Sequence, residues 1–295
     1  MLKNQNLIVI GKNSYIGGYF TKYASDNNNI ISLSSKDCNF LDSEKVDNLF
    51  RNLSNDRPYT IVCLAGISRL VANSFDSYNE NVKIVNNLIK HCKLTNIQSI
   101  IYFSSVDVYG SKPSLPIAEQ SKIEPDTWYG LAKYSCEWML ISSGEVKCPV
   151  TILRIPGIYG HAPNDRSAIA KIASSIKNEQ RVYIKGSGQN LRDYVYLEDI
   201  CNLLALLIPL QYHGTINVAT GQSHAIIDIA NLIAKIFHIE LEVIYQPPEA
   251  EREFDLMFDT QKLTSLVPNF RFTPLEEGIR SYFQESSQHS TGESK

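Results

Sequence analysis

The chain has 295 residues, of which 43% are hydrophobic and 20% are charged, and its formal net charge is −3. This composition supplies enough apolar material for a folded core and excludes disorder for most of the chain. The charge excludes a strong basic field of the kind that holds nucleic acid or an anionic membrane.

The cysteines and the apolar runs indicate a cytoplasmic protein with reduced thiols. No two of the six cysteines have a CxxC spacing, and several lie in apolar runs such as residues 61–64. This pattern favours buried thiols over a disulfide framework or a metal site. The apolar run 203–210 is far shorter than the ~20 residues that cross a bilayer. The first residues also lack the ~7–15-residue apolar segment of a signal peptide.

Apolar runs and helical periods alternate in the first half of the chain. Strands are predicted at residues 7–10, 30–33, 60–65, 100–103 and 150–153, and helices between them at 16–24, 46–53, 82–92 and 129–141. Uninterrupted apolar strands that alternate with helices are typical of a parallel sheet covered on both faces. The fold class is therefore α/β.

The second half has a less regular pattern, which predicts a smaller mixed lobe. Helices are predicted at 169–176 and 225–237, and short strands at 182–184, 215–219 and 241–245. We expect a first domain over 1–164 that the chain re-enters near 191–225, and a lobe built from 165–190 and 226–283. The polar tail 284–295 lacks apolar periodicity, so we expect it to be disordered.

The first strand runs into a glycine turn that is followed by a helix. Gly11 would make the turn, Gly17 would let the helix pack on the strand, and Ser14 stands where a second glycine is usual. Such a turn places backbone N–H groups and a helix N-terminus beside a pyrophosphate. An ordinary strand–turn–helix would show the same local pattern.

The residues after the second strand bear on the choice of cofactor. Ser34 and Ser35 stand where an acidic residue would bind the ribose of NAD, and Lys36 follows them. Hydroxyls and an ammonium group suit the 2′-phosphate of NADPH, which a carboxylate would repel. We therefore favour NADPH, with NADH as the alternative because Asp37 is adjacent. Asp42, after Leu41, is placed where a carboxylate could accept from the adenine amino group.

Tyr129 and Lys133 lie four residues apart at the start of a predicted helix, which places them on one face. A phenol has a pKa of ~10, so it needs a nearby cation to exchange protons near pH 7. Ser105 ends the preceding strand segment and would hold a reacting carbonyl oxygen.

These segments occur together with Leu153-Arg154 to Gly160, with residues 192–196 and with residues 252–255. In this combination the chain resembles the extended short-chain dehydrogenase/reductases, the nucleotide-sugar epimerase, dehydratase and reductase family, over residues 7–283. The resemblance implies a Rossmann doubly wound sheet with the catalytic residues Ser105, Tyr129 and Lys133. It also implies a C-terminal lobe that binds a nucleoside diphosphate sugar, with Arg192 and Arg252 facing the diphosphate. Either arginine could instead form a salt bridge with Asp193 or Asp255.

The resemblance also implies the cofactor contacts and a homodimer. The cofactor-binding residues that we expect are Gly11, Ser14, Tyr15, Ile16, Gly17, Ser34, Ser35, Lys36, Leu41, Asp42, Leu64, Ala65, Gly66, Tyr129 and Lys133. We expect no metal.

Departures from the family's patterns narrow the reaction. Dehydratases carry an acidic pair just after the catalytic hydroxyl, where this chain has Val106 and Asp107. The family's epimerases often have an asparagine where Gly157 stands here, and many have an insertion after the second strand that is missing from this compact chain. Asp107 and His161 would border the sugar as an acid and base, or would be loop residues that face water.

These points favour an NADPH-dependent reductase of a nucleoside diphospho-4-keto-6-deoxy sugar. Its product would be an activated deoxysugar for surface polysaccharide. Two alternatives stay open. One is an NAD-dependent nucleotide-sugar 4-epimerase, and the other is a dinucleotide sensor without catalytic activity.

Overall fold

The computed structural model describes residues 2–54, 57–92, 96–160, 165, 167–248 and 254–289. It forms two compact units. Unit 1 consists of residues 1–110, 122–155 and 201–217, and unit 2 consists of residues 111–121, 156–200 and 218–295. The chain thus returns to unit 1 over 201–217.

Unit 1 is built on a six-stranded sheet in the order β10-β5-β4-β3-β1-β2, in which all neighbouring strands are parallel. The strands are β1 (Asn6–Ile10), β2 (Asn29–Leu33), β3 (Tyr59–Cys63), β4 (Ile97–Ser105), β5 (Val150–Ile155) and β10 (Gly214–Asn217). The parallel sheet of an α/β fold that the sequence predicted is confirmed. Its strands carry few polar residues because both faces are covered.

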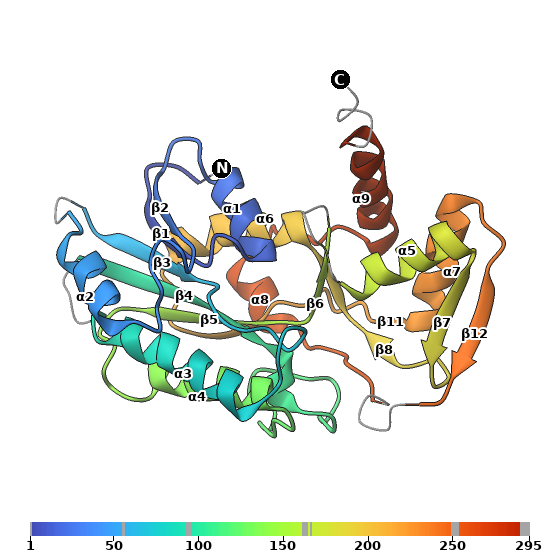
Figure 1. Cartoon of the computed structure of the whole chain (residues 1–295), viewed down its shortest axis with the longest axis horizontal. Helices are drawn as coiled ribbons and strands as arrows, with labels where there is room; N and C mark the ends of the chain where they lie inside the picture. The colour runs from blue at the N-terminus through green and yellow to red at the C-terminus, as the bar shows by residue number, and fades with distance from the viewer. Residues whose placement is uncertain are drawn as a thin grey trace. The chain divides into compact units, whose positions relative to one another are not determined.

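The helices of unit 1 lie on the two faces of this sheet. They are α1 (Tyr15–Tyr23), α2 (Ser43–Arg51), α3 (Phe75–Ile89), α4 (Trp128–Ile141) and α6 (Leu197–Leu210), whose first turn belongs to unit 2. In Figure 1, α3 and α4 run side by side on one face and α1 and α6 lie on the other. One apolar core joins the sheet to α2, α3 and α4, with Ile61, Leu88 and Ile100 fully buried.

The described residues of unit 2 form three small two-stranded sheets and four further helices. The parallel pairs are β6 (Gly157–Tyr159) with β9 (Tyr194–Tyr196) and β7 (Arg181–Lys185) with β12 (Glu242–Gln246), and the antiparallel pair is β8 (Leu191–Arg192) with β11 (His224–Ala225). The helices are α5 (Ala168–Glu179), α7 (Ile226–Phe237), α8 (Gln261–Leu266) and α9 (Leu275–His289). The core of unit 2 packs Ile169, Ile176, Ile233 and Ile279 from three of these helices.

The expected disorder from residue 284 onward is wrong for its first part, because α9 continues to His289. Ile279 and Tyr282 anchor the helix in the core of unit 2, and Glu276 forms an i,i+4 ion pair with Arg280 at 2.7 Å. A few buried positions that pack against a core, together with i,i+4 ion pairs, can keep a polar segment helical. Residues 290–295 lie outside the described part of the chain.

Candidate active site

The turn between β1 and α1 has the close backbone approach that the glycines predicted. Gly11 has φ +102°, and a Cβ there would lie 3.0 Å from the amide nitrogen of Ala65. A Cβ on Gly17 would clash with the carbonyl oxygen of Gly11. Ser14 caps the helix, because its side chain accepts from the amide of Gly17 at 3.1 Å.

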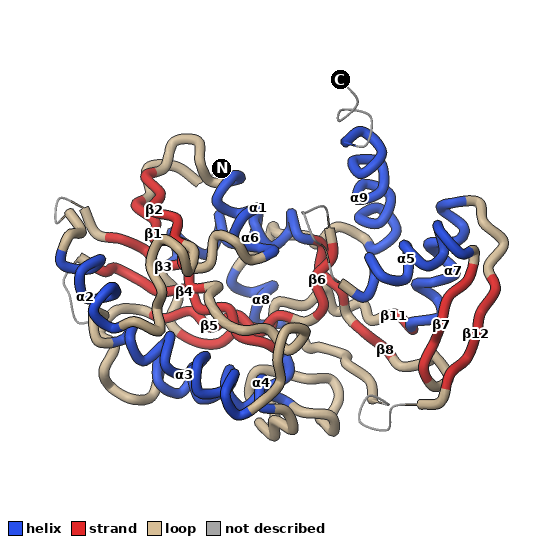
Figure 2. The backbone as a smooth tube through the Cα atoms, viewed as in Figure 1, coloured by secondary structure: helices blue, strands red, loops and turns tan. Residues whose placement is uncertain are grey.

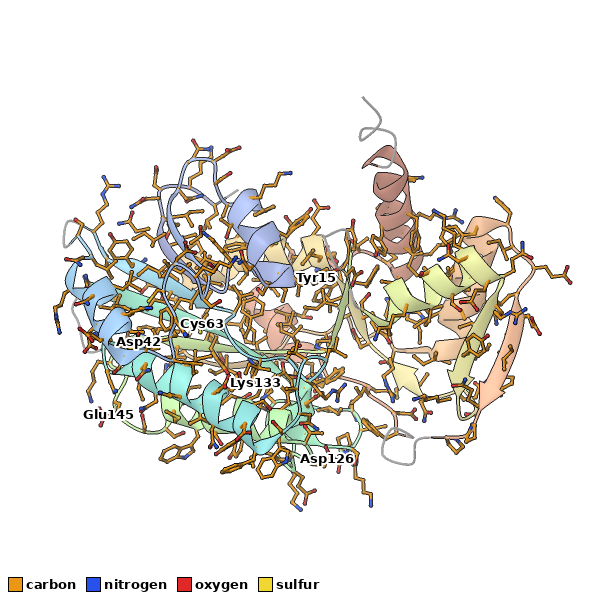
Figure 3. The ribbon with its side chains drawn as sticks, viewed as in Figure 1. Tyr15, Asp42, Cys63, Asp126, Lys133 and Glu145 are labelled. Carbon is orange, nitrogen blue, oxygen red and sulfur yellow. The ribbon has the colours of Figure 1, made fainter. Side chains whose placement is uncertain are left out.

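The first turn of α1 therefore starts at the end of β1, beside the residues that follow β3. Tyr15 and Ile16 form that first turn (Figure 3 labels Tyr15), and the amide of Leu64 donates to the carbonyl of Ile10 at 2.9 Å. This is a cradle that a side chain at Gly11 or Gly17 would fill. It fits a dinucleotide whose pyrophosphate meets the helix N-terminus.

Just after the end of β2, the Asp37 carboxylate lies next to Ser34. It accepts from the Ser34 amide at 2.8 Å and from the Ser34 hydroxyl at 2.6 Å, and it pairs with Lys12 at 2.9 Å. These Ser34 hydrogen bonds, with Lys12, hold the pKa of Asp37 well below its usual range, so the group is ionised. Ser35 and Lys36 are exposed on the same turn. No local sequence pattern predicts the Lys12–Asp37 pair, because the two residues come from different turns.

Asp42 has a different partner from the one that we expected. Its Oδ1 atom accepts from the amides of Glu44 and Lys45 at 3.1 and 3.3 Å, which makes it the N-cap of α2. The signal was present in the sequence, because Asp is a preferred N-cap residue before a helix. Its neighbour Leu41 packs against the core of unit 1. Contact of Leu41 and Asp42 with an adenine stays a prediction.

Ser105, Tyr129 and Lys133 come together at the carboxyl end of β4. The Lys133 ammonium group donates to the carbonyl of Phe103 at 2.7 Å and lies 5.7 Å from the centre of the Tyr129 ring. The Ser105 hydroxyl lowers the pKa of the Tyr129 side chain. Lys133 is 5% exposed and extends from α4 toward the sheet (Figure 3).

Burial opposes charge on both members of the Tyr129–Lys133 pair. It lowers the pKa of Lys133, and it raises the pKa of Tyr129 above its usual value. The Asp107 carboxylate raises the pKa of Tyr129 further, whereas the Ser105 hydrogen bond and the Arg69 cation lower it. The phenol form is therefore favoured, which suits a proton donor.

Asparagines that the sequence analysis missed hold the loop between β3 and α3 next to these residues. Asn81, which is 4% exposed, accepts from the Ile67 amide at 2.7 Å and donates to its carbonyl at 3.1 Å. The Asn73 side chain accepts from the Tyr129 amide at 3.0 Å. A Cβ on Gly66 would lie 2.9 Å from Asn81 Oδ1 and 3.7 Å from Lys133 Nζ. Gly66 thus borders the ammonium group, as a cofactor-lining residue must.

A buried polar network connects α4 to three strands of the sheet. Arg154 donates to Glu137 at 2.7 Å and to the Tyr109 hydroxyl at 2.8 Å. Tyr109 in turn donates to Asn217 at 2.7 Å, and Ser104 donates to Glu137 at 2.5 Å. The network ties α4 to β4, β5 and β10, and so fixes the helix that carries Tyr129 and Lys133.

Two predicted sugar-nucleotide residues, His161 and Arg252, lie outside the described residues. Asp107 is described, and it forms an ion pair with Arg69 at 2.9 Å. In unit 2, Arg192 donates to the carbonyls of Leu191 and Phe254, and its guanidinium lies 4.9 Å from the centre of the Phe254 ring. The segment that follows Arg252 therefore lies against Arg192.

Asp193 and Asp255 are the acidic neighbours of Arg192. Their carboxylates both accept hydrogen bonds from backbone amides. Asp255 accepts from the Leu191 amide at 2.8 Å. Asp193 is 2% exposed and accepts from the amide and hydroxyl of Thr220 and from the amide of Gly221 at 2.9–3.0 Å. Burial raises the pKa of Asp193 to about 6 against the effect of these hydrogen bonds.

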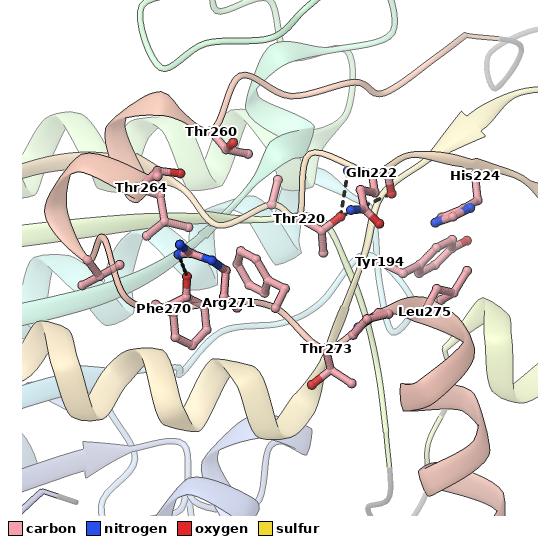
Figure 4. Close-up of a pocket in the computed structure, with 15 residues that line it drawn as sticks. Tyr194, Thr220, Gln222, His224, Thr260, Thr264, Phe270, Arg271, Thr273 and Leu275 are labelled. Atoms are coloured by element: carbon pink, nitrogen blue, oxygen red, sulfur yellow. Dashed lines mark hydrogen bonds between the residues drawn. The ribbon is translucent and has the colours of Figure 1, made fainter.

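Unit 2 also contains a cavity of about 240 Å³. Aromatic and threonine side chains line it with Arg271 and His224, and Thr220 and Tyr194 form part of its wall (Figure 4). All of its lining residues belong to unit 2, whereas Ser105, Tyr129 and Lys133 belong to unit 1.

Neither a metal cluster nor a membrane span is found within the part of the chain that the structure describes. No group of three or more His, Cys, Asp or Glu residues in it could hold a metal ion, and no helix in it is long and apolar enough to cross a bilayer. All six cysteines are described, and each is a free thiol.

Comparison with known proteins matches most of the chain to one family. The sequence model of the NAD dependent epimerase/dehydratase family matches residues 7–219. A trifunctional UDP-glucose 4,6-dehydratase/UDP-4-keto-6-deoxy-D-glucose 3,5-epimerase/UDP-4-keto-L-rhamnose-reductase of Arabidopsis thaliana is 30% identical over 217 residues, which cover 70% of this chain and 32% of that protein. The chain thus spans about a third of that relative. A GDP-L-fucose synthase of Dictyostelium discoideum is 24% identical over 307 residues, 95% of this chain and 94% of that protein.

Solved structures agree on the fold. A UDP-N-acetylglucosamine 4-epimerase from Methanobrevibacter ruminantium superposes with a TM-score of 0.84 at 24% identity, over 98% of this chain and 100% of that one. The structure of RMD from Pseudomonas aeruginosa complexed with NADPH gives 0.83 at 20% identity, over 97% and 100%.

Proposed function

The chain belongs to the NAD dependent epimerase/dehydratase family, and we propose that it is an NADPH-dependent reductase of a nucleoside diphospho-4-keto-6-deoxy sugar. The observation that supports this proposal is the grouping of Ser105, Tyr129 and Lys133 at the end of β4, in which the Tyr129 ring lies 5.7 Å from a buried ammonium group and Ser105 lowers the pKa of the phenol. A proton donor held in this way suits reduction of a carbonyl. One relative that the chain matches over nearly its whole length is named a GDP-L-fucose synthase.

Two positions argue against the alternative reactions. Val106 is 6% exposed and apolar, so it cannot share proton transfer with Asp107 as the acidic pair of the family's dehydratases would. A Cβ on Gly157 would lie 2.5 Å from the Tyr194 ring. This leaves no room for the asparagine side chain that many of the family's epimerases have there.

The glycine turn, with Ser14 and the residues Leu64, Ala65 and Gly66, would hold the dinucleotide, and Ser34, Ser35 and Lys36 would face its 2′-phosphate. When bound, the nicotinamide supplies the hydride that reduces the keto carbon. Ser105 would donate a hydrogen bond to the keto oxygen and Tyr129 would give it a proton. Lys133 would anchor the nicotinamide ribose and favour the phenolate that Tyr129 leaves behind.

Arg192 and Arg252 would bind the diphosphate of the sugar nucleotide, and Asp107 and His161 would border the sugar. A guanidinium suits the diphosphate because it can give two parallel hydrogen bonds to phosphate oxygens. In the structure the Nη1 atom of Arg192 donates to the carbonyls of Leu191 and Phe254.

The test is to incubate the purified protein with 4-keto-6-deoxy sugars carried on dTDP, GDP, UDP and CDP, each with NADPH or NADH. We expect one nucleotide series to oxidise NADPH in a one-to-one ratio with the loss of the keto sugar. Interconversion of 4-epimers with retained NAD and no net use of NADPH would instead select the epimerase. Cofactor binding without turnover of any sugar nucleotide would select the sensor.

A further inference from the structure

An ion pair between Arg69 and Asp107 lies next to Ser105, and the proposed reaction assigns no role to its arginine. Arg69, on the loop between β3 and α3, contacts the Asp107 carboxylate at 2.9 Å. The Asp107 side chain is 18% exposed and that of Arg69 is 42% exposed. Both charges act on the Tyr129 hydroxyl, and they do so in opposite directions.

The backbone on the Asp107 side of this pair is fixed against the catalytic groups. The Asp107 amide donates to Ser105 Oγ at 3.1 Å, and its carbonyl lies so close to Gly130 that a Cβ there would clash with it. Gly130 directly follows Tyr129 at the start of α4. The Asp107 backbone is therefore packed against Ser105 on one side and against the residue that follows Tyr129 on the other.

The backbone on the Arg69 side is held from two directions. Asn81 binds both backbone groups of Ile67, and the carbonyl of Ser68 accepts from the amides of Val71 and Ala72. Asn73 then binds the Tyr129 amide at 3.0 Å. Arg69 therefore lies on the loop between Ile67, which Asn81 of α3 binds, and Asn73, which binds the first turn of α4.

We propose that Arg69 is a positioning residue of the active site, which holds the Asp107 carboxylate through their ion pair at 2.9 Å and offsets its charge next to Ser105 and the start of α4. The assignment rests on the proposed function for its catalytic meaning. The charged groups near the phenol are Asp107 on η1 (Val106–Tyr109), Arg69 on the β3–α3 loop, and Lys133 on the phenol's own helix.

The signs follow from electrostatics. A carboxylate near a phenol stabilises the neutral form, and a guanidinium stabilises the phenolate. Removing Arg69 should therefore make Tyr129 harder to ionise, and removing the charge of Asp107 should make it easier. A single charge at this range, screened by solvent, should change the phenolate-to-phenol ratio by about threefold or more at a given pH.

The ionisation of Tyr129 is measurable without cofactor or substrate. The full chain is labelled with [¹³Cζ]tyrosine, and its NMR signals are followed as the pH rises while the protein stays folded. The signal that is missing in Tyr129→Phe identifies Tyr129. The variants compared are Arg69→Ala, Arg69→Lys, Asp107→Asn and the double variant Arg69→Ala/Asp107→Asn, with Arg51→Ala on α2 as a matched loss of an exposed arginine from unit 1.

At the highest pH at which all variants remain folded, we expect the ionised fraction of Tyr129 to be lowest in Arg69→Ala and highest in Asp107→Asn. The double variant should lie between them, and Arg69→Lys and Arg51→Ala should match the wild type. Equal ionisation in Arg69→Ala and Asp107→Asn, or a loss in Arg51→Ala as large as in Arg69→Ala, would overturn the proposal.

Turnover provides a second readout that depends on the proposed reaction. If the protein reduces a keto sugar, the alkaline limb of kcat/KM should move up in Arg69→Ala and down in Asp107→Asn. If the NMR order is found but no sugar nucleotide is reduced, the ion pair has its assigned effect and the proposed reaction is the part that fails. If a keto sugar is reduced but the variants do not show this order by NMR, the proposed reaction holds and the effect assigned to the ion pair is the part that fails.

Discussion

Tyr129 is the residue on which the proposed chemistry depends most directly. Its backbone amide donates to Asn73 and its ring lies 5.7 Å from the Lys133 ammonium group. Removing only the hydroxyl should leave these packing contacts in place.

Tyr129→Phe should therefore abolish turnover and leave cofactor affinity nearly unchanged. General acid catalysis typically contributes ~10²–10⁴-fold to the rate, so kcat should fall by at least about 100-fold. Steady-state kinetics and titration of NADPH fluorescence measure the two quantities. A variant that keeps more than about a tenth of the wild-type kcat would remove Tyr129 from the proposed role.

We expect the turn after β2 to decide between NADPH and NADH, and the structure places Lys12 beside this turn. Asp37 binds Ser34 and Lys12, so two groups that suit a 2′-phosphate are already engaged by a carboxylate. Lys36 is exposed beside them. Cofactor choice then depends on the balance between Lys36 and Asp37.

Lys36→Asp should weaken NADPH binding by about tenfold or more while affecting NADH much less, because a charge-assisted bond contributes ~1.5–3 kcal/mol. Asp37→Asn should have the opposite sign, because it releases Lys12 and removes a charge that repels the phosphate. Dissociation constants for both cofactors test this pair. Equal effects of Lys36→Asp on NADPH and NADH would show that Lys36 is only a solvated turn residue.

Asp193 predicts a pH dependence of stability. Its pKa is raised from 3.8 to about 6 in the folded chain, so the folded state binds this proton more tightly than the unfolded state does. The resulting stabilisation is fully present below pH ~4 and is lost as the pH rises through 6.

The free energy of unfolding of the wild type minus that of Asp193→Asn should therefore fall between pH 4 and 7, by on the order of 3 kcal/mol. Denaturant unfolding at several pH values measures it, with the exposed Asp228→Asn as a control in the same unit. A difference that stays constant or grows with pH would contradict the assignment.

At the scale of elements, the sequence predicted best where a local pattern alone determines the structure. The buried strands of unit 1 and the helices between them follow from apolar periodicity, and the close approach of Gly11 and Gly17 follows from the glycine spacing. The two-residue strands β8 and β11 were missed, because their pairing depends on residues that are distant in the sequence. The Arg69–Asp107 and Lys12–Asp37 pairs were missed for the same reason.

The segment 254–256 is a further case in which tertiary contacts dominate. It lies along β8 because Asp255 and Leu256 bind the backbone of Leu191 while Arg192 covers Phe254. The sequence placed Arg192 and Arg252 in separate motifs, and the structure brings the segments of these motifs together within unit 2.

Arg192→Ala should raise the KM for the sugar nucleotide by about 10- to 100-fold with little change in cofactor KM, since a charge-assisted bond of ~1.5–3 kcal/mol is lost. Arg192→Lys should restore only part of the affinity because it cannot reproduce the bidentate fork. Titration of UDP, CDP, dTDP and GDP measures binding directly, and Arg181→Ala, paired with Glu242 in the same unit, is the matched control. Nucleotide binding that is unaffected by Arg192→Ala would exclude it from the diphosphate site.

At the scale of the whole molecule, one outward surface of unit 1 is unusually apolar. We call it the α3/α4 face. Its exposed side chains are Phe75 at 56%, Trp128 at 41%, Leu131 at 37%, Tyr134 at 36% and Trp138 at 54%. Phe75 packs edge-on against Trp128 at 5.3 Å between ring centres, and α3 and α4 run side by side (Figure 2).

A contiguous exposed patch of aromatic side chains is typical of a protein–protein interface, and two side-by-side helices offer a surface that a second copy can cover with the same residues. The homodimer expected from the sequence would form in this way. Trp138→Glu and Leu131→Glu should each shift the protein toward the monomer by placing a carboxylate in the covered centre. Tyr183→Glu makes the same change at an exposed aromatic residue of unit 2 and should leave the mass unchanged. Sedimentation equilibrium over a range of concentrations distinguishes the outcomes. A wild type that is monomeric throughout, or a dimer that both α4 variants leave intact, would place the partner contact elsewhere or remove it.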